Sequence, residues 1–187
     1  MSLEQIRDSM PDYARDIRLN LGSVLTPQGA PGLTEKQIAL IAVATAIAAR
    51  NVAFARAVED WSRDRLDETS IAGARAAAAI MGMNNVYYRF LHLVEDEEYG
   101  TMPARLRMNV IGSPGIDRLD FELLSLAVSA VNGCGLCITS HERKLREEGA
   151  SREAVQSAVR IAAVIHAAAG VDEYERSARH GELEEAA

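Results

Sequence analysis

The chain has 187 residues, 48% of them apolar, and carries a formal net charge of −7. This length and apolar content predict one globular domain, or two similar halves that share a core. Arginines are interspersed with acids, which argues against a nucleic-acid partner because phosphate binding needs a concentrated basic face. The opening MSLEQIRDSMPDYARD lacks the apolar region of a signal peptide and is interrupted by Pro11, so a cytoplasmic protein is expected.

Helical signals recur along the chain, whereas strand signals are scarce. Aromatic residues make up only 5% of the chain, and no apolar and polar alternation bounded by hairpin turns is found. An all-α fold is therefore predicted. The first helix is expected over residues 2–21, with an interruption at Pro11 and an end at Gly22.

A capping box is expected to begin the next helix, over 35–49, because Gln37 follows Thr34 by three residues. Its apolar run IALIAVATAIAA (38–49) is too short to span a bilayer, so we predict a buried helix and no membrane association. Further helices are predicted over 52–65, 69–82 and 84–97.

A long connection is predicted over residues 99–120, where glycines and prolines recur. Helices are then expected over 120–131, 134–148 and 151–169. Gly149 separates the last two of these helices. The acidic end GELEEAA (181–187) is expected to be a solvated tail.

Two parts of the chain, about 34–98 and 119–180, resemble one another. A shift of 85 residues places QIALIAVATAIAARNVAFAR (37–56) on ELLSLAVSAVNGCGLCITSH (122–141), and the same shift aligns RAAAAI with RIAAVI. We therefore predict a duplicated helical unit within a single domain, 1–187. The shift pairs Ala49 with Cys134, Val52 with Cys137, Arg56 with His141 and Gln37 with Glu122. Chemistry is thus expected in the second half alone.

Both cysteines lie in the segment NGCGLCITSH, with a histidine four residues after the second. On a helix, positions 134, 137 and 141 fall within a stripe about 60° wide, so both sulfurs and the imidazole share a face. Cys134 is expected near a helix start, where free N–H groups favour a thiolate. His141, one turn after Cys137, can take its proton. In a reducing compartment such a pair favours redox catalysis or metal binding.

Glu122 joins this cluster only if the chain reverses direction. In one unbroken helix it would lie roughly 28 Å from His141. The Asn132-Gly133 pair supplies a natural break, which allows the helix that carries Glu122 to pack against the helix that carries the cysteines.

Other interpretations of the cluster stay open at this stage. Free cysteines are often small buried residues. A zinc site could use Cys134, Cys137, His141 and Glu122, although structural zinc commonly draws a second ligand pair from a distant segment and the chain has no further cysteine. A decarboxylase or binding protein could share the helical fold, but two thiols on one face favour disulfide exchange.

The spacing E-x11-C-x2-C-x3-H, formed by Glu122, Cys134, Cys137 and His141, resembles the active-site signature of the alkyl hydroperoxidase D (AhpD) family, within the carboxymuconolactone decarboxylase-like superfamily. The segments LEQIRDSMPDYARDIRLNL, AAAAIMGMNNVYYRF and LRMNVIGSPGIDRLDFELLSLAVSAVNGC resemble the same family. The resemblance covers most of residues 3–170 and implies an all-helical, duplicated fold that assembles as a homotrimer.

The resemblance also implies an antioxidant activity, as a thiol-disulfide oxidoreductase or peroxidase. Electrons would pass from NADH through dihydrolipoamide dehydrogenase to the lipoamide of a lipoyl-bearing dihydrolipoamide acyltransferase. The CxxC pair would take them from lipoamide and reduce the peroxiredoxin AhpC or, weakly, a hydroperoxide. No tightly bound cofactor is expected, and the sequence has no nucleotide-binding glycine fingerprint or Walker motif.

Transferred residue by residue, the resemblance makes Cys137 the thiolate that attacks or is oxidised, and Cys134 its disulfide partner and a proton donor. His141 and Glu122 would complete a proton relay. The chain departs from the family at Leu136, where members often carry a second histidine, so a relay through that position has no support.

Overall fold

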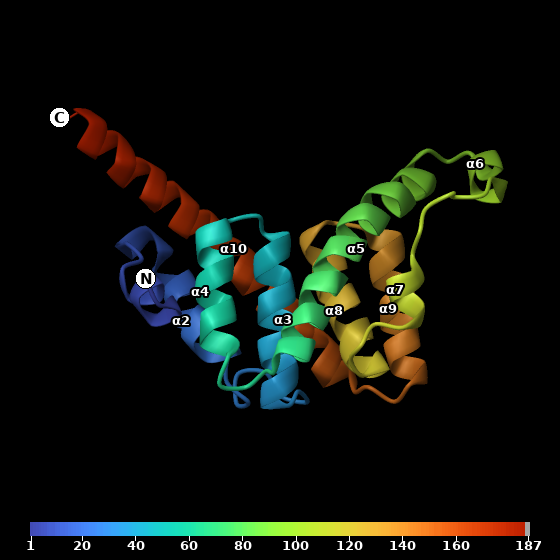
Figure 1. Ribbon diagram of the computed structural model, residues 1–187, viewed down its shortest axis with the longest axis horizontal. Helices are drawn as coiled ribbons and strands as arrows, with labels where there is room; N and C mark the ends of the chain where they lie inside the picture. The colour runs from blue at the N-terminus through green and yellow to red at the C-terminus, as the bar shows by residue number, and fades with distance from the viewer. Residues whose placement is uncertain (186–187) are drawn as a thin grey trace.

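The computed structural model describes residues 1–185, with side chains described as far as Ala178. Within this range every regular element is a helix, which confirms the all-α prediction (Figure 1). In chain order the elements are α1 (Leu3–Asp8), a 3-10 turn (Asp12–Ala14), α2 (Arg15–Val24), α3 (Glu35–Ala48), α4 (Val52–Ser62), α5 (Glu68–Leu93), α6 (Glu97–Thr101), α7 (Asn109–Gly112), α8 (Arg118–Val131), α9 (Gly135–Glu147) and α10 (Arg152–Glu185).

Short sequence signals determine the break after α1 and the start of α3. The predicted interruption lies at Pro11, which separates α1 from the turn that leads into α2. Gly22, however, lies inside α2, so the predicted end there is wrong. The capping box of α3 is present as predicted: Thr34 Oγ1 accepts from Gln37 N at 3.2 Å, and Gln37 Oε1 accepts from Thr34 N at 3.0 Å.

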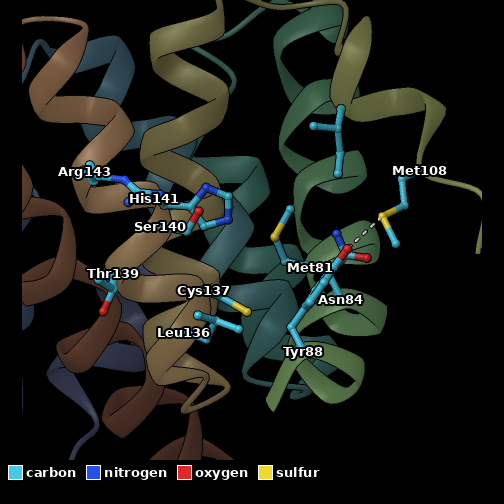
Figure 2. Close-up of a pocket in the computed structure, with 11 residues that line it drawn as sticks. Met81, Asn84, Tyr88, Met108, Leu136, Cys137, Thr139, Ser140, His141 and Arg143 are labelled. Carbon is cyan, nitrogen blue, oxygen red and sulfur yellow. Dashed lines mark hydrogen bonds between the residues drawn. The ribbon is translucent and has the colours of Figure 1, made fainter. Parts of the chain in front are cut away.

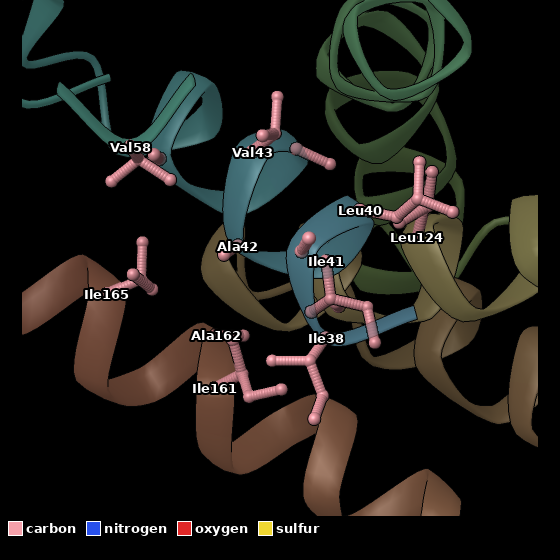
Figure 3. Close-up of a cluster of buried hydrophobic side chains, with 14 of the residues drawn as sticks. Ile38, Leu40, Ile41, Ala42, Val43, Val58, Leu124, Ile161, Ala162 and Ile165 are labelled. Atoms are coloured by element: carbon pink, nitrogen blue, oxygen red, sulfur yellow. The ribbon is translucent and has the colours of Figure 1, made fainter. Parts of the chain in front are cut away.

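Helix α3 is the centre of the hydrophobic core. All its residues from Ile38 to Ala46 are buried, because it contacts α4, α5, α8 and α10 on different sides. Figure 3 shows Leu40 pointing toward Leu124 of α8, while Ile38 points toward α10. A helix that is apolar all round needs such complete coverage, and the bundle provides it.

Two predicted helix ends were wrong for one physical reason. The helices expected over 69–82 and 84–97 form the single helix α5, which ends at Leu93 rather than at residue 97, and α10 continues past residue 169. Glycine in a helix interior costs only about 1 kcal/mol, which tertiary packing exceeds. Asn84 and Asn85 are buried in the bundle and do not end the helix.

Helix α10 includes a stretch, Arg152–Ala178, that is long and apolar enough to cross a membrane by length and composition, with a mean hydropathy of 1.4. A core helix meets the same test, and α10 contacts α2, α3 and α8. These contacts explain its apolar residues. The predicted solvated tail, 181–187, lies outside the described side chains and stays a prediction.

Helices α3 and α8 correspond with an offset of 83 residues. Both have 14 residues, and their first residues, Glu35 and Arg118, are 83 positions apart. After each helix comes a residue with positive φ and then the N-cap of the next helix: Arg50 and Asn51, then Gly133 and Cys134. This offset differs by two from the shift of 85.

The corresponding helix starts also contact each other. Gln37 and Asp120, the third residues of α3 and α8, are joined by a hydrogen bond of 2.9 Å from Nε2 to Oδ1. The third residues of these two 14-residue helices are therefore in direct contact. The division of the chain into halves 34–98 and 119–180 stays a prediction.

Gly73 and Gly82 provide a matched test of packing within helix α5. A Cβ at position 73 would lie 2.5 Å from Ile116 Cγ2, whereas position 82 has open space. We expect Gly73→Ala to lower the free energy of unfolding by about 1–3 kcal/mol, because Ile116 must move. Gly82→Ala should raise it by about 0.5–1 kcal/mol. Urea denaturation measures both changes, and equal effects would contradict the contact with Ile116.

Candidate active site

The reversal of the chain between α8 and α9 creates the site. Asn132 ends α8, Gly133 has a φ of 68°, and Cys134 is the N-cap of α9. Glycine adopts this left-handed conformation without the cost that a Cβ imposes. The break therefore lies where the Asn-Gly pair predicted it.

The two cysteines differ in access. They are joined by a disulfide at the start of α9. Cys134 is fully buried, whereas Cys137 is 7% exposed and lines a cavity. Cys134 Sγ also accepts a hydrogen bond from the Cys137 backbone N at 3.3 Å. Cys137 is thus the sulfur that a reactant can reach, and Cys134 is the sulfur that the helix N-terminus can stabilise as a thiolate.

Glu122 and His141 meet across the α8 and α9 pair. Glu122 Oε2 lies 2.7 Å from His141 Nδ1, so the approach that required a chain reversal is confirmed. A carboxylate only accepts, so Nδ1 carries the proton of this hydrogen bond. Nε2 is left as the ring nitrogen available for proton exchange at the cavity, which His141 also lines.

Lys144 is a further member of the site that the sequence analysis missed. Its ammonium donates to Oε1 of Glu122, the oxygen that His141 does not use. Continuing the helical stripe from Cys134, Cys137 and His141 by three residues would have identified it.

The Glu122 carboxyl is buried, with 5% of the residue exposed. Burial raises its pKa, but the hydrogen bonds and charges of His141 and Lys144 lower it more, so the pKa of Glu122 lies below its usual value. The group is therefore ionised at neutral pH. It can hold the imidazole in one tautomer and orientation.

A polar network on α5 anchors the end of α8. The side chain of Asn85 donates to Ser129 Oγ at 2.8 Å and accepts from Asn132 Nδ2 at 2.9 Å. Arg89 donates to the carbonyl of Asn132 at 2.7 Å. These bonds position the turn that precedes Cys134, and none of them was predicted, because α5 is distant in sequence.

A cavity of about 490 Å³ opens beside Cys137 (Figure 2). Helices α5 and α9 and the segment around α7 contribute its walls. Its lining residues are Met81, Asn84, Tyr88, Met108, Ile111, Leu136, Cys137, Thr139, Ser140, His141 and Arg143. A cavity of this size and largely apolar character fits a small organic molecule.

Metal binding was the alternative use of the same residues. Among the residues that the structure describes, no group of three or more His, Cys, Asp and Glu side chains is arranged to hold a metal ion. The sulfurs are instead bonded to each other.

Comparison with known proteins gives the family. The chain is similar to the alkyl hydroperoxide reductase AhpD of Rhodospirillum centenum, with 54% identity over 91% of this chain and 90% of the relative. The AhpD of Rhizorhabdus wittichii is also 54% identical, over 91% of this chain and 97% of the relative. The chain belongs to the AhpD family. A profile of the Carboxymuconolactone decarboxylase family matches residues 97–174. The resemblance found in the sequence is thus confirmed.

The lowered pKa of Glu122 predicts a pH-dependent contribution to stability. A depressed carboxyl pKa stabilises the fold above the unfolded-state pKa of about 4.3, and this stabilisation is lost as the pH falls through the folded-state value. The free energy of unfolding of wild type should therefore exceed that of Glu122→Gln most at neutral pH. Urea denaturation between pH 7 and acid pH measures this difference.

The control for this experiment is Glu147→Gln, which changes an exposed carboxylate on the same helix as His141. Its difference from wild type should be small and nearly constant with pH. If the difference for Glu122→Gln were equally constant, the assigned ion pairs would not stabilise the ionised carboxylate.

Proposed function

We propose that the protein is an antioxidant thiol-disulfide oxidoreductase that cycles Cys134 and Cys137 between dithiol and disulfide. One observation carries this proposal: the accessible sulfur of a disulfide borders a cavity that also contains an imidazole held by a buried carboxylate. The relatives' name, alkyl hydroperoxide reductase, agrees with this chemistry.

Lipoamide on a partner lipoyl domain is the proposed electron donor. In the reduced form, dihydrolipoamide, a dithiol sits at the end of an aliphatic arm, and the largely apolar cavity suits such an arm. One dihydrolipoamide would reduce the protein disulfide to a dithiol and become the cyclic disulfide. A dihydrolipoamide acyltransferase would carry the lipoyl group, and dihydrolipoamide dehydrogenase would restore it with NADH. The protein itself then needs no tightly bound cofactor.

The geometry supports a role for each group in this proposed exchange. A lipoyl thiolate attacks Cys137 Sγ, the S–S bond breaks, and Cys134 leaves as a thiolate at the N-cap of α9. The second lipoyl thiol then attacks the mixed disulfide and releases Cys137. His141 moves the proton at Cys137 through Nε2, and Glu122 orients and stabilises the imidazole through Nδ1.

The reduced pair has two proposed acceptors. The disulfide of the peroxiredoxin AhpC would be reduced by a second dithiol-disulfide exchange. A hydroperoxide would be reduced to an alcohol and water, while the two thiols return to the disulfide. Both reactions require a compartment that keeps thiols reduced, so we propose a cytoplasmic location.

We also propose a homotrimer. Val86, Phe90 and Leu93 follow one another at helical spacing on α5, and they are 57%, 46% and 68% exposed. Apolar side chains that share an exposed helix face are typical of a contact surface.

A coupled assay tests the proposed function. Dihydrolipoamide dehydrogenase, lipoamide, NADH and a hydroperoxide are mixed with the protein, with and without a peroxiredoxin, and NADH loss is followed. We expect turnover that Cys137→Ser abolishes.

Mass spectrometry after mild peroxide treatment should show the loss of two hydrogens on a peptide that contains Cys134 and Cys137. One bound zinc per chain without a disulfide would contradict the proposal.

The proton relay predicts a second result. General acid-base assistance is typically worth about 10²–10⁴-fold, so Glu122→Gln and His141→Gln should each lower lipoamide-dependent turnover by at least about tenfold. The double variant should lose little more than either single variant, because the two groups act as one unit. Steady-state rates of the two single variants and the double variant measure each loss and show whether the losses add. An unchanged rate and an unchanged Cys137 pKa in Glu122→Gln would exclude the relay.

A further inference from the structure

One side chain in the cavity has a buried polar atom that no protein group satisfies. In the part of the chain with described side chains, Asn84 Oδ1 and Ser125 Oγ are buried without a hydrogen-bond partner. Only the Asn84 side chain lines the cavity beside Cys137. Asn84 is itself 5% exposed, so it is a buried carboxamide at the wall of a reactive cavity.

Asn85, the next residue in the chain, is a buried carboxamide that does have hydrogen-bond partners. Asn85 is fully buried, and its carboxamide bonds to Ser129 and Asn132. The large majority of buried polar side-chain atoms in proteins have such partners, and an unpaired one destabilises the fold. Asn84 Oδ1 lacks such a partner, and because Asn84 lines the same cavity as Cys137, this atom points to a partner outside the protein.

Asn84 lines the cavity from the same face of α5 as Met81 and Tyr88. Figure 2 shows Met81, Asn84 and Tyr88 projecting from α5, and Cys137 and His141 projecting from α9. Met81 lies three residues before Asn84 and Tyr88 four residues after it, so one helix face presents a polar group between two largely apolar ones. A molecule that entered the cavity would lie between this face of α5 and Cys137 on α9.

We propose that Asn84 is a substrate-positioning residue, whose carboxamide hydrogen-bonds to the polar reacting end of the molecule held against Cys137. The apolar stem of that molecule lies along Met81, Met108 and Ile111. This proposal rests on the proposed function and specifies its substrate class: aliphatic dithiols or hydroperoxides, whose S–H or O–H group meets the carboxamide. A carboxamide both donates and accepts, so it can serve either reactant.

The test compares Asn84→Leu and Asn84→Ala with wild type. A neutral hydrogen bond contributes modestly, so kcat/KM for dihydrolipoamide or for an alkyl hydroperoxide should fall about three- to tenfold, mainly through KM. The thermal midpoint of Asn84→Leu should stay equal to that of wild type or rise, because an unpaired buried polar atom is removed. The two substrates are assayed separately, which shows which reactant uses the contact.

Asn85→Ala is the control for a purely structural role. It should lower the thermal midpoint, because Ser129 and Asn132 lose their partners. If Asn84→Leu lowered the thermal midpoint in the same way and left KM for both substrates unchanged, Asn84 would be structural and the proposal would be overturned.

An equilibrium measurement separates this proposal from the proposed function. Calorimetry of dihydrolipoamide binding to Cys137→Ser, with and without Asn84→Leu, needs no turnover. A dissociation constant raised about three- to tenfold by Asn84→Leu supports the contact even if the wild type shows no peroxide-reducing activity. An unchanged constant overturns the contact with the dithiol, and an unchanged KM for the hydroperoxide as well overturns the proposal entirely.

Discussion

The reversal of the chain at Gly133 is the constraint on which the site depends. Without it, Glu122 and His141 would stand at opposite ends of one long helix, roughly 28 Å apart. With it, α9 packs against α8 and the two side chains lie 2.7 Å apart. The same turn places Cys134 at a helix N-cap, where backbone N–H groups are free to stabilise a thiolate.

The buried carboxylate of Glu122 is the second requirement. An isolated buried ion is strongly destabilising, and a paired one is tolerated only when its oxygens are satisfied. His141 and Lys144 each take one oxygen. Lys144 does not line the cavity, but together with His141 it lowers the pKa of the carboxyl group that orients the imidazole.

The first half of the chain uses the same local geometry for a different purpose. Asn51, like Cys134, follows a residue of positive φ and caps the next helix. Its carboxamide donates to Asp172 Oδ2 at 2.9 Å and to the carbonyl of Ala169 at 3.0 Å, which fastens α10 to the bundle. The same backbone turn thus precedes a packing residue at Asn51 and the first cysteine of the CxxC pair at Cys134.

The sequence by itself determined the features that depend on neighbouring residues. These were the all-helical class, the capping box at Thr34, the interruption at Pro11, the break at Asn132-Gly133 and the shared face of the cysteines and histidine. Each follows from backbone preferences or helical spacing over a few residues.

Only the tertiary structure decided the features that depend on packing between distant segments. The continuation of α5 past Gly82, the cavity between α5 and α9, and the contrast between Asn84 and Asn85 all follow from which side chains the bundle buries and pairs. The polar network with Ser129 joins residues that are 44 positions apart. Local sequence preferences carry no information about such contacts, because their energy comes from burial and pairing that exist only after the helices have packed.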